Sequence, residues 1–289
     1  MKKTIMMVFM LPFAVFSQTD SIKVSITSTE VAPNIFRLFV ENRVAVTVMV
    51  GSDGAFMIDA AYEHTANKIL EEVENLSDKP LKYLLNTHLH GDHTGGNPII
   101  GKGLQIIAHQ QVRDYLSNEQ KRGDKVIPPM PEHALPNIIV SSRQTIEFNN
   151  EQIEIIPLTG GHTGGDIIVF FPKSKVLVVG DLLFANYFPY VDTGNGGNPF
   201  KYIENIEWIT QNFSDDVTVI GGHGPVYTLQ QYKAYQQTLQ KTIDTVRESK
   251  QNELTAEQMK EQRILKEWEA MGNFFITEDR WIDTLYPFL

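Results

Sequence analysis

Histidines and acids gather in one short segment of the chain, residues 88–93. The segment reads His88-Leu89-His90-Gly91-Asp92-His93, so four potential metal ligands fall within six residues although the chain has only eight histidines. Side chains two residues apart on an extended chain point the same way, so His88 and His90 can share one metal ion. Gly91 permits a sharp turn, after which Asp92 and His93 face a second position. This density favours a metal site over a polar loop with solvated histidines.

Four further segments carry a polar residue close to the end of an apolar stretch. They are Ile58-Asp59, Gly160-Gly161-His162, Val179-Gly180-Asp181 and Gly221-Gly222-His223-Gly224-Pro225. Each is ambiguous alone, because a lone histidine among glycines is more often structural and an acid after a strand is usually a turn residue. Their shared placement predicts that they meet at one edge of the fold. Asp59 is then a plausible hydrogen-bond acceptor for a ligand histidine.

Alternating strands and helices are expected to position these segments. Strand-like stretches fall at 35–40, 43–50, 55–58, 81–85, 106–108, 138–148, 153–157, 167–171, 176–179 and 217–220. Helical spacing of apolar residues falls at 69–76, 112–116 and 205–213. Residues 121–137 contain four prolines, which predicts a long irregular loop, and we expect it near the metal edge. The motif His-Thr-Gly-Gly occurs at 93–96 and again at 162–165, which suits a site between two similar β-rich halves.

The C-terminal tail, from about residue 228 to 289, is predicted to be helical. Apolar residues recur every three or four positions from Leu229 to Val246, and Thr255 with Gln258 forms a capping box. No linker divides the chain before this tail. We therefore expect residues 18–289 to form a single domain.

The first seventeen residues have the order of a secretory signal peptide. Lys2 and Lys3 precede an apolar run at 5–16, and Ser17 supplies a small residue for cleavage. The run is too short to span a bilayer as a helix. The expected mature protein is exported, periplasmic or secreted, with no stable membrane insertion after residues 1–17 are removed.

Composition excludes several kinds of chemistry. Lysine plus arginine is 25 and aspartate plus glutamate is 35, and the resulting net charge of −10 argues against a nucleic-acid partner held by a basic patch. The chain has no cysteine, so disulfides, thiolate nucleophiles and cysteine-ligated zinc are excluded. Any metal must be held by histidines and carboxylates. The expected partner is a small-molecule substrate.

The histidine-rich segment, followed by His162, Asp181 and His223 in that order, resembles the metallo-β-lactamase-fold superfamily of metallohydrolases. The likeness extends from about residue 30 to the segment 221–225 and the helix after it. It implies an α/β fold, an αββα four-layer sandwich, here with a helical C-terminal tail. It also implies two metal ions, usually zinc, at one edge of the sheets.

The resemblance also implies a ligand set. One ion would be held by His88, His90 and His162, and the second by Asp92, His93 and His223. Asp181 matches the bridging carboxylate of the glyoxalase-II-like branch, whereas β-lactamases with a cysteine ligand have cysteine there. Phe184 stands where those β-lactamases commonly have a basic residue. Both differences disfavour a β-lactamase specifically and leave the hydrolase prediction intact.

The implied function is that of an exported binuclear zinc-dependent hydrolase. Two ions about 3.5–4 Å apart can share a water and lower its pKa, and the bridging hydroxide then attacks a carbonyl-type substrate. An ester, lactone, thioester or lactam would suit this chemistry. Asp92 is predicted to be the catalytic carboxylate that orients the hydroxide and later moves a proton. Imidazole and carboxylate ligands also suit iron and manganese.

Three alternatives stay open at this point. They are a β-lactamase that acts on antibiotics, a mononuclear iron dioxygenase of the same fold, and a non-catalytic metal-binding protein. The complete seven-residue ligand set disfavours the last of these. For substrate contacts, the stretch from Tyr187 to Asn198 could supply a partly aromatic wall or could be an ordinary surface loop.

Overall fold

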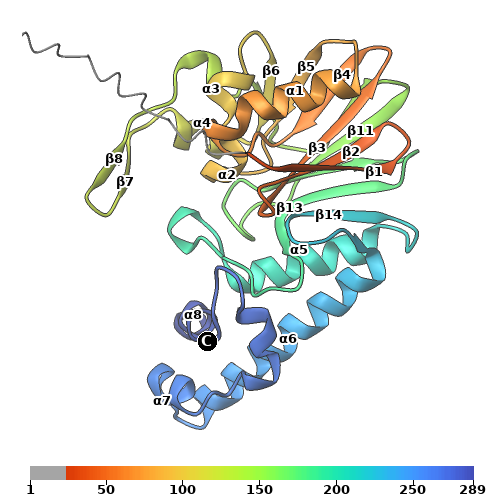
Figure 1. Cartoon of the computed structure of the whole chain (residues 1–289). Coiled ribbons are helices and arrows are strands. Elements are labelled where there is room, and N and C mark those ends of the chain that lie inside the picture. The colour runs from red at the N-terminus through yellow and green to blue at the C-terminus, as the bar shows by residue number, and fades with distance from the viewer. Residues whose placement is uncertain (1–23) are drawn as a thin grey trace, which may run out of the picture.

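Two β-sheets stack face to face with helices on both outer sides (Figure 1). The computed structural model describes residues 24–289, so the expected signal peptide at 1–17 lies outside the described residues. In the described part, one sheet has seven strands, the other has six, and a two-stranded hairpin stands apart from both. The predicted αββα sandwich with a helical tail is therefore confirmed.

The first sheet begins as an antiparallel meander and continues as parallel strands. Its order is β1 (Ile26–Ala32), β2 (Ile35–Val40), β3 (Val44–Gly51), β4 (Gly54–Ile58), β5 (Leu81–Leu85), β6 (Gln105–Ala108) and β9 (Ile138–Ile139). The helix α1 (Ala66–Leu76) connects β4 to β5 and buries Ile69 and Val73. Parallel β4, β5 and β6 present their carboxyl ends at one edge, where Asp59 and the histidine-rich segment follow.

The second sheet is antiparallel except for one central pair. Its order is β10 (Gln144–Phe148), β11 (Glu151–Pro157), β12 (Ile167–Phe171), β13 (Val176–Phe184), β14 (Thr218–His223) and β15 (Tyr227–Thr228). The parallel strands β13 and β14 are joined by α5 (Pro199–Asn212), which begins at the side-chain cap Asn198. This crossover brings Asp181 on β13 and His223 on β14 to the same edge.

Apolar side chains fill three layers of core. One cluster lies between α1 and the first sheet, one between the two sheets, and one between the second sheet and the helices beneath it. The strands in the middle of the sandwich are buried on both faces, and every residue of β13 is buried. Burial on both faces explains why residues 176–179, the first part of β13, form a continuous apolar run and not an alternating pattern.

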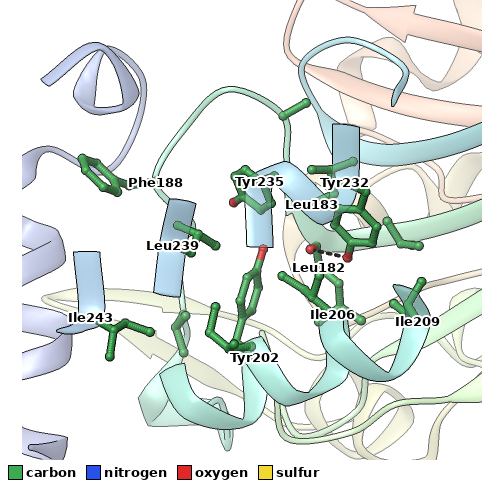
Figure 2. Close-up of a cluster of buried hydrophobic side chains, with 14 of the residues drawn as sticks. Leu182, Leu183, Phe188, Tyr202, Ile206, Ile209, Tyr232, Tyr235, Leu239 and Ile243 are labelled. Atoms are coloured by element: carbon green, nitrogen blue, oxygen red, sulfur yellow. Dashed lines mark hydrogen bonds between the residues drawn. The ribbon is translucent and has the colours of Figure 1, made fainter. Parts of the chain in front are cut away.

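The helical tail packs against the outer side of the second sheet. It contains α6 (Leu229–Gln251), α7 (Ala256–Glu261) and α8 (Glu278–Leu285). Figure 2 shows Tyr232, Tyr235 and Leu239 of α6 facing α5 and β13, and the Tyr232 hydroxyl donates to the carbonyl oxygen of Leu182 at 2.8 Å. The predicted capping box at Thr255 and Gln258 begins α7, so this sequence signal is confirmed.

Three element predictions need correction. The proline-rich stretch is not wholly irregular, because a hairpin of β7 (Gln120–Arg122) and β8 (Lys125–Ile127) turns at Gly123 before the prolines begin. The strand expected at 138–148 is two strands, β9 and β10, which belong to different sheets because the chain bends at Ser141-Ser142. The strand expected to end at Val179 continues to Phe184 and carries Asp181 within it. Within residues 24–289, no helix has the length and apolarity to cross a membrane.

Candidate metal centre

All seven side chains predicted as metal ligands converge at one edge of the two sheets. They form two adjoining groups, and in each group one ligand atom per residue lies within 4.8 Å of the others. The first group contains His88, His90, His162 and Asp181, and the second contains Asp92, His93 and His223. Apart from Asp181, which the resemblance implies to be shared, the two groups have the same members as the two implied sets.

Asp181 lies between the two groups. Its carboxylate oxygens are 3.2 Å from His93 Nε2 and 3.3 Å from His223 Nε2 in the second group. The same carboxylate is 3.5 Å from His162 Nε2 and 3.7 Å from His88 Nε2 in the first group. A carboxylate in this position can serve both groups at once, as a bridging ligand must.

The segment after β5 turns directly into a short helix. His90 occupies the N-cap position of α2 (Gly91–Thr94), so Asp92 and His93 lie in its first turn. Gly91 does not adopt a left-handed φ, and a Cβ built there meets nothing within 4 Å. The expected sharp turn at Gly91 is therefore the ordinary start of a helix, which does not need a glycine.

Glycine is required at two other positions around Asp181. Gly180 has φ +52°, and the register between β13 and β14 is irregular around it, as in a bulge that redirects a side chain. On β14, a Cβ at Gly222 would lie 1.9 Å from Asp181 Oδ1. The two glycines let β13 and β14 bring their ligands close together.

In each of the five histidines, one ring nitrogen points away from the other ligands and makes a hydrogen bond. We call it the outer nitrogen, and the one that faces the other ligands the inner nitrogen. His162 Nδ1–H donates to the carbonyl oxygen of Tyr190 and His223 Nδ1–H to that of Arg43, both at 2.7 Å. These acceptors are carbonyls, so they fix the tautomer of each ring.

The other three outer nitrogens are held by side chains. Asp192 Oδ2 accepts from His90 Nε2–H and Asp59 Oδ2 accepts from His93 Nδ1–H, both at 2.8 Å. The Thr87 hydroxyl donates to Asp59, so it accepts from His88 Nδ1–H at 3.0 Å. The hydrogen bond from His93 to Asp59 fits the predicted role of Asp59 as an acceptor for a ligand histidine.

With the outer nitrogens protonated, the inner nitrogens present lone pairs to one another. His90 Nδ1 lies 3.1 Å from His88 Nε2 and 2.9 Å from His162 Nε2. Three lone pairs this close repel unless a cation or a proton stands among them. A tetrahedral zinc ion with bonds of about 2.0–2.1 Å to nitrogen sets its ligands roughly 3.3 Å apart. The first group therefore fits a metal ion.

Two buried atoms where the groups meet make no hydrogen bond, although they lie 3.2 Å apart: His93 Nε2 of the second group and Oδ1 of the shared Asp181. Such atoms are rare in folded proteins, because leaving a buried polar atom without a hydrogen bond is costly. Both belong to residues that face the other ligands of the group. A second cation would satisfy both atoms, so the residues of this group fit a metal as well.

Charge in the site is unbalanced when only the protein is considered. Burial alone would lower the pKa of His93, yet Asp181, Asp59 and Asp92 outweigh it and raise that pKa well above its usual range. Burial lowers the pKa of His162 to about 3, although Asp181 opposes the shift. Burial would raise the pKa of Asp181, but His223, His93 and His88 hold it well below its usual range. The acids thus favour a positive charge beside Asp181, and a bound cation would supply that charge while leaving the imidazoles neutral, as metal ligands must be.

The loop that carries His162 is held by a buried acid. Asp166 accepts hydrogen bonds from the backbone N–H groups of His162 and Thr163, at 2.8 and 2.9 Å, and from the Thr163 hydroxyl. Burial raises the pKa of Asp166 to about 7 although these bonds oppose the shift. The second His-Thr-Gly-Gly copy thus places its histidine in the site, as expected for its position after a strand.

The two groups open into a cavity of about 1130 Å³. Asp92, with 24% of its side chain exposed, is the most open of the seven residues. Besides the ligands, the cavity is lined by the β2–β3 turn, Tyr62, Tyr115, β7, Phe184, the stretch after β13 and the loop before α8. Apart from the ligands and Phe184, the lining residues that the sequence analysis singled out are Tyr190 and Asn195 of the stretch after β13 and Lys121 of the stretch 121–137.

Several residues of the site were not foreseen from sequence. Asp192 showed no spacing signal, and the Arg43 and Tyr190 carbonyls have no side-chain signature at all. Phe274 and Phe275, also in the cavity wall, are adjacent aromatics in a polar stretch, which is a signal that could have been used. Of the expected aromatic stretch, Phe188 is buried in the core against Trp281, and Asn198 caps α5.

Comparisons with known proteins agree with this geometry. A model of the metallo-beta-lactamase superfamily matches residues 40–227. A hydroxyacylglutathione hydrolase, GloC, of Haemophilus influenzae is 32% identical over 193 residues, which cover 62% of this chain and 84% of that protein.

Solved structures share the fold at lower identity. A metallo-beta-lactamase from Pontibacter korlensis has a TM-score of 0.62 at 18% identity, over 75% of this chain and 99% of its own. The sec-alkylsulfatase Pisa1 from Pseudomonas sp. has a TM-score of 0.71 at 13% identity, over 90% of this chain and 50% of its own.

The chain therefore belongs to the metallo-beta-lactamase superfamily, as the family match over most of its folded part shows. Its curated relatives include hydroxyacylglutathione hydrolases, which act on small molecules.

Proposed function

We propose that this protein is a binuclear zinc-dependent hydrolase of carbonyl-type substrates. The single observation that carries the proposal is the convergence of five histidines in two adjoining groups. The inner nitrogens of each group face one another, and Asp181 lies between the groups. His88, His90 and His162 would hold one ion, and Asp92, His93 and His223 the other, with Asp181 shared. The fold and the hydrolase relatives support the same class of reaction.

Bound at these positions, a pair of divalent ions would supply a water of lowered pKa and a Lewis acid for the attacked oxygen. Water adds its oxygen to the acyl carbon, the bond to the leaving oxygen, sulfur or nitrogen breaks, and that atom takes up a proton. Asp92 is the group we assign to hold and deliver this proton, because it is the ligand that opens most to the cavity.

The surrounding residues keep the ligands oriented. Asp59, Asp192 and Thr87 hold three of the rings by their outer nitrogens, and the Arg43 and Tyr190 carbonyls hold the other two. Phe184 stacks on the His223 ring at 4.9 Å between centroids and supplies an apolar backing. The chemistry needs no serine or cysteine nucleophile.

A hydrolysis panel tests this function. Zinc-loaded protein should turn over at least one of an aryl ester, a lactone, a thioester or the lactam nitrocefin, and chelator should abolish that turnover. One tightly held iron per chain, with oxidation of a substrate in place of hydrolysis, would instead support the dioxygenase alternative. Metal binding without turnover of any panel member would support a non-catalytic protein.

We also propose that the chain is exported. The proposal rests on the sequence of residues 1–17, which lie before the described part of the chain. Full-length protein made in a bacterium should be recovered from the periplasm, starting near Gln18, and deletion of residues 2–17 should keep it in the cytoplasm. Recovery of the uncleaved chain, beginning at Met1, from the cytoplasm would contradict export.

A further inference from the structure

Two phenylalanines of the tail stand exposed at the cavity. In the described part of the chain, large hydrophobic side chains are exposed at four positions: Val126, Phe274, Phe275 and Phe288. Phe274 and Phe275 are 39% and 51% exposed, and both line the cavity that contains Asp92 and Asp181. Water-exposed aromatic rings beside a reaction site are the usual sign of an apolar ligand surface.

The two rings are held in place by neighbours. Phe274 stacks on Tyr187 at 4.8 Å between centroids and tilts against His223 at 5.6 Å. Phe275 meets the edge of Tyr190 at 5.4 Å, and Tyr190 in turn lies 5.5 Å from His90. One ring of the tail is therefore fixed beside each of the two ligand groups.

Arg280 of α8 secures the second ring. Its guanidinium lies over Phe275 at 4.8 Å from the centroid, and its Nη1 donates to the Phe275 carbonyl oxygen at 3.1 Å. Figure 1 shows the loop before α8, in dark blue, rising from the helical tail towards the sheets. A ring held rigidly before a ligand arrives loses little conformational entropy on binding.

We call Phe274 and Phe275 together the aromatic wall. Both belong to the tail and lie beyond residue 227, where the superfamily match ends. The charged lining groups of the cavity lie on other elements: Glu41 and Arg43 at the β2–β3 turn, Lys121 on β7, and Asp92, Asp181 and Asp192 in and around the ligand groups. The cavity thus has an apolar side formed by the tail and a charged side formed by the rest of the chain.

We propose that Phe274 and Phe275 bind an apolar alkyl or aryl substituent of the substrate, so that esters and related acyl compounds that carry a large apolar group are the preferred substrate class. The proposal rests on the hydrolase function above and specifies its substrate. The substituent lies against the two rings while the carbonyl faces the ligand groups.

A chain-length series tests the wall. Complete burial of one methylene favours binding by about fourfold. The wall covers an alkyl chain only in part, so we expect kcat/KM to rise by roughly tenfold or more from p-nitrophenyl acetate to p-nitrophenyl octanoate. The double variant Phe274→Ala/Phe275→Ala should lower this octanoate-to-acetate ratio at least about fivefold, and Phe275→Leu should retain most of it. A matched series of ethyl and octyl acetate shows whether the wall takes the acyl or the alcohol side.

Phe288→Ala is the matched control, because Phe288 is a similarly exposed phenylalanine of the tail that lines a neighbouring cavity. This variant should keep the wild-type ratio. If the double variant keeps the wild-type ratio in both ester series, the wall does not bind the substituent and the proposal is overturned.

A binding measurement separates this proposal from the hydrolase function. Zinc-loaded wild-type protein should enhance the fluorescence of N-phenyl-1-naphthylamine, a neutral apolar probe, and the double variant should bind it at least about fivefold more weakly. This result would support the wall even if no ester were hydrolysed, in which case the hydrolase proposal alone would fail for esters. Equal binding of the probe by wild type and double variant would overturn the wall.

Discussion

At the scale of single residues, the outer hydrogen bonds of the histidines matter as much as the ligand atoms. Asp59 and Asp192 hold the His93 and His90 rings, and neither acid belongs to the two ligand groups. The hydrogen bonds from His90 and Asn195 lower the pKa of Asp192 to about 2, although burial opposes the shift, so this acceptor is ionised at neutral pH.

Loss of such an acceptor should weaken metal binding. We expect Asp59→Asn and Asp192→Asn each to lower zinc affinity about 10–100-fold, because the neutral amide accepts more weakly from the ring N–H and its NH2 group, if turned to the ring, favours the wrong tautomer. Competition with a chromophoric chelator measures the change. Asp78→Asn removes a carboxylate whose side chain is 87% exposed and should leave the affinity unchanged; equal effects of all three substitutions would contradict the positioning role.

We predict that Asp92 both binds a metal ion and delivers a proton to the leaving group. We expect Asp92→Asn to lower kcat on the best substrate by at least about 100-fold, since general acid–base groups typically contribute 10²–10⁴-fold. The measurement is steady-state turnover at saturating zinc, with zinc content determined in parallel. Turnover equal to that of the wild type would show that the proton is carried elsewhere.

At the scale of elements, the parallel pair β13 and β14 sets the spacing of the centre. We expect Gly222→Ala to displace Asp181 and reduce bound zinc by about one equivalent or more, because its Cβ would come within 1.9 Å of Asp181 Oδ1. Metal analysis of the purified variant is the measurement. Gly91→Ala, where a Cβ meets nothing, should keep the full zinc content.

The seven residues that converge at the site and most of the elements could be predicted from the sequence. The residues at 88–93 are close in sequence, and Asp181 and His223 follow apolar stretches, whereas their division into two ligand sets is what the family resemblance implies. The acceptors Arg43 and Tyr190 act through backbone carbonyls, which every residue has. The division of 138–148 between two sheets and the contact of Phe274 with His223 depend on long-range packing, which local patterns do not encode.

At the scale of the whole molecule, the tail is part of the core. Trp281 of α8 is fully buried, stacks near Phe188 and donates through Nε1–H to the Thr242 hydroxyl at 2.9 Å. The same α8 carries Arg280, which supports the Phe275 wall. The same helix therefore contributes to the hydrophobic core and holds one side of the cavity in place.

Truncation of this anchor should destabilise the protein. We expect Trp281→Ala to lower the free energy of unfolding by about 3–5 kcal/mol, the usual cost of deleting a large buried aromatic side chain. Urea denaturation followed by circular dichroism measures it, and Trp281→Phe, which keeps much of the volume, should lose less. A midpoint for Trp281→Ala equal to that of the wild type would mean that α8 is not docked on the core.

The proposed function depends most on two cations held by seven side chains. Metal-free protein titrated with zinc in a calorimeter, with elemental analysis of the product, tests this directly. We predict close to two zinc ions per chain and a rise in melting temperature on loading, because ions that bind only the folded state stabilise it. Two results would contradict this prediction: no zinc retained by the wild-type protein after titration with excess zinc, or zinc binding by a His88→Ala/His223→Ala variant that equals that of the wild type.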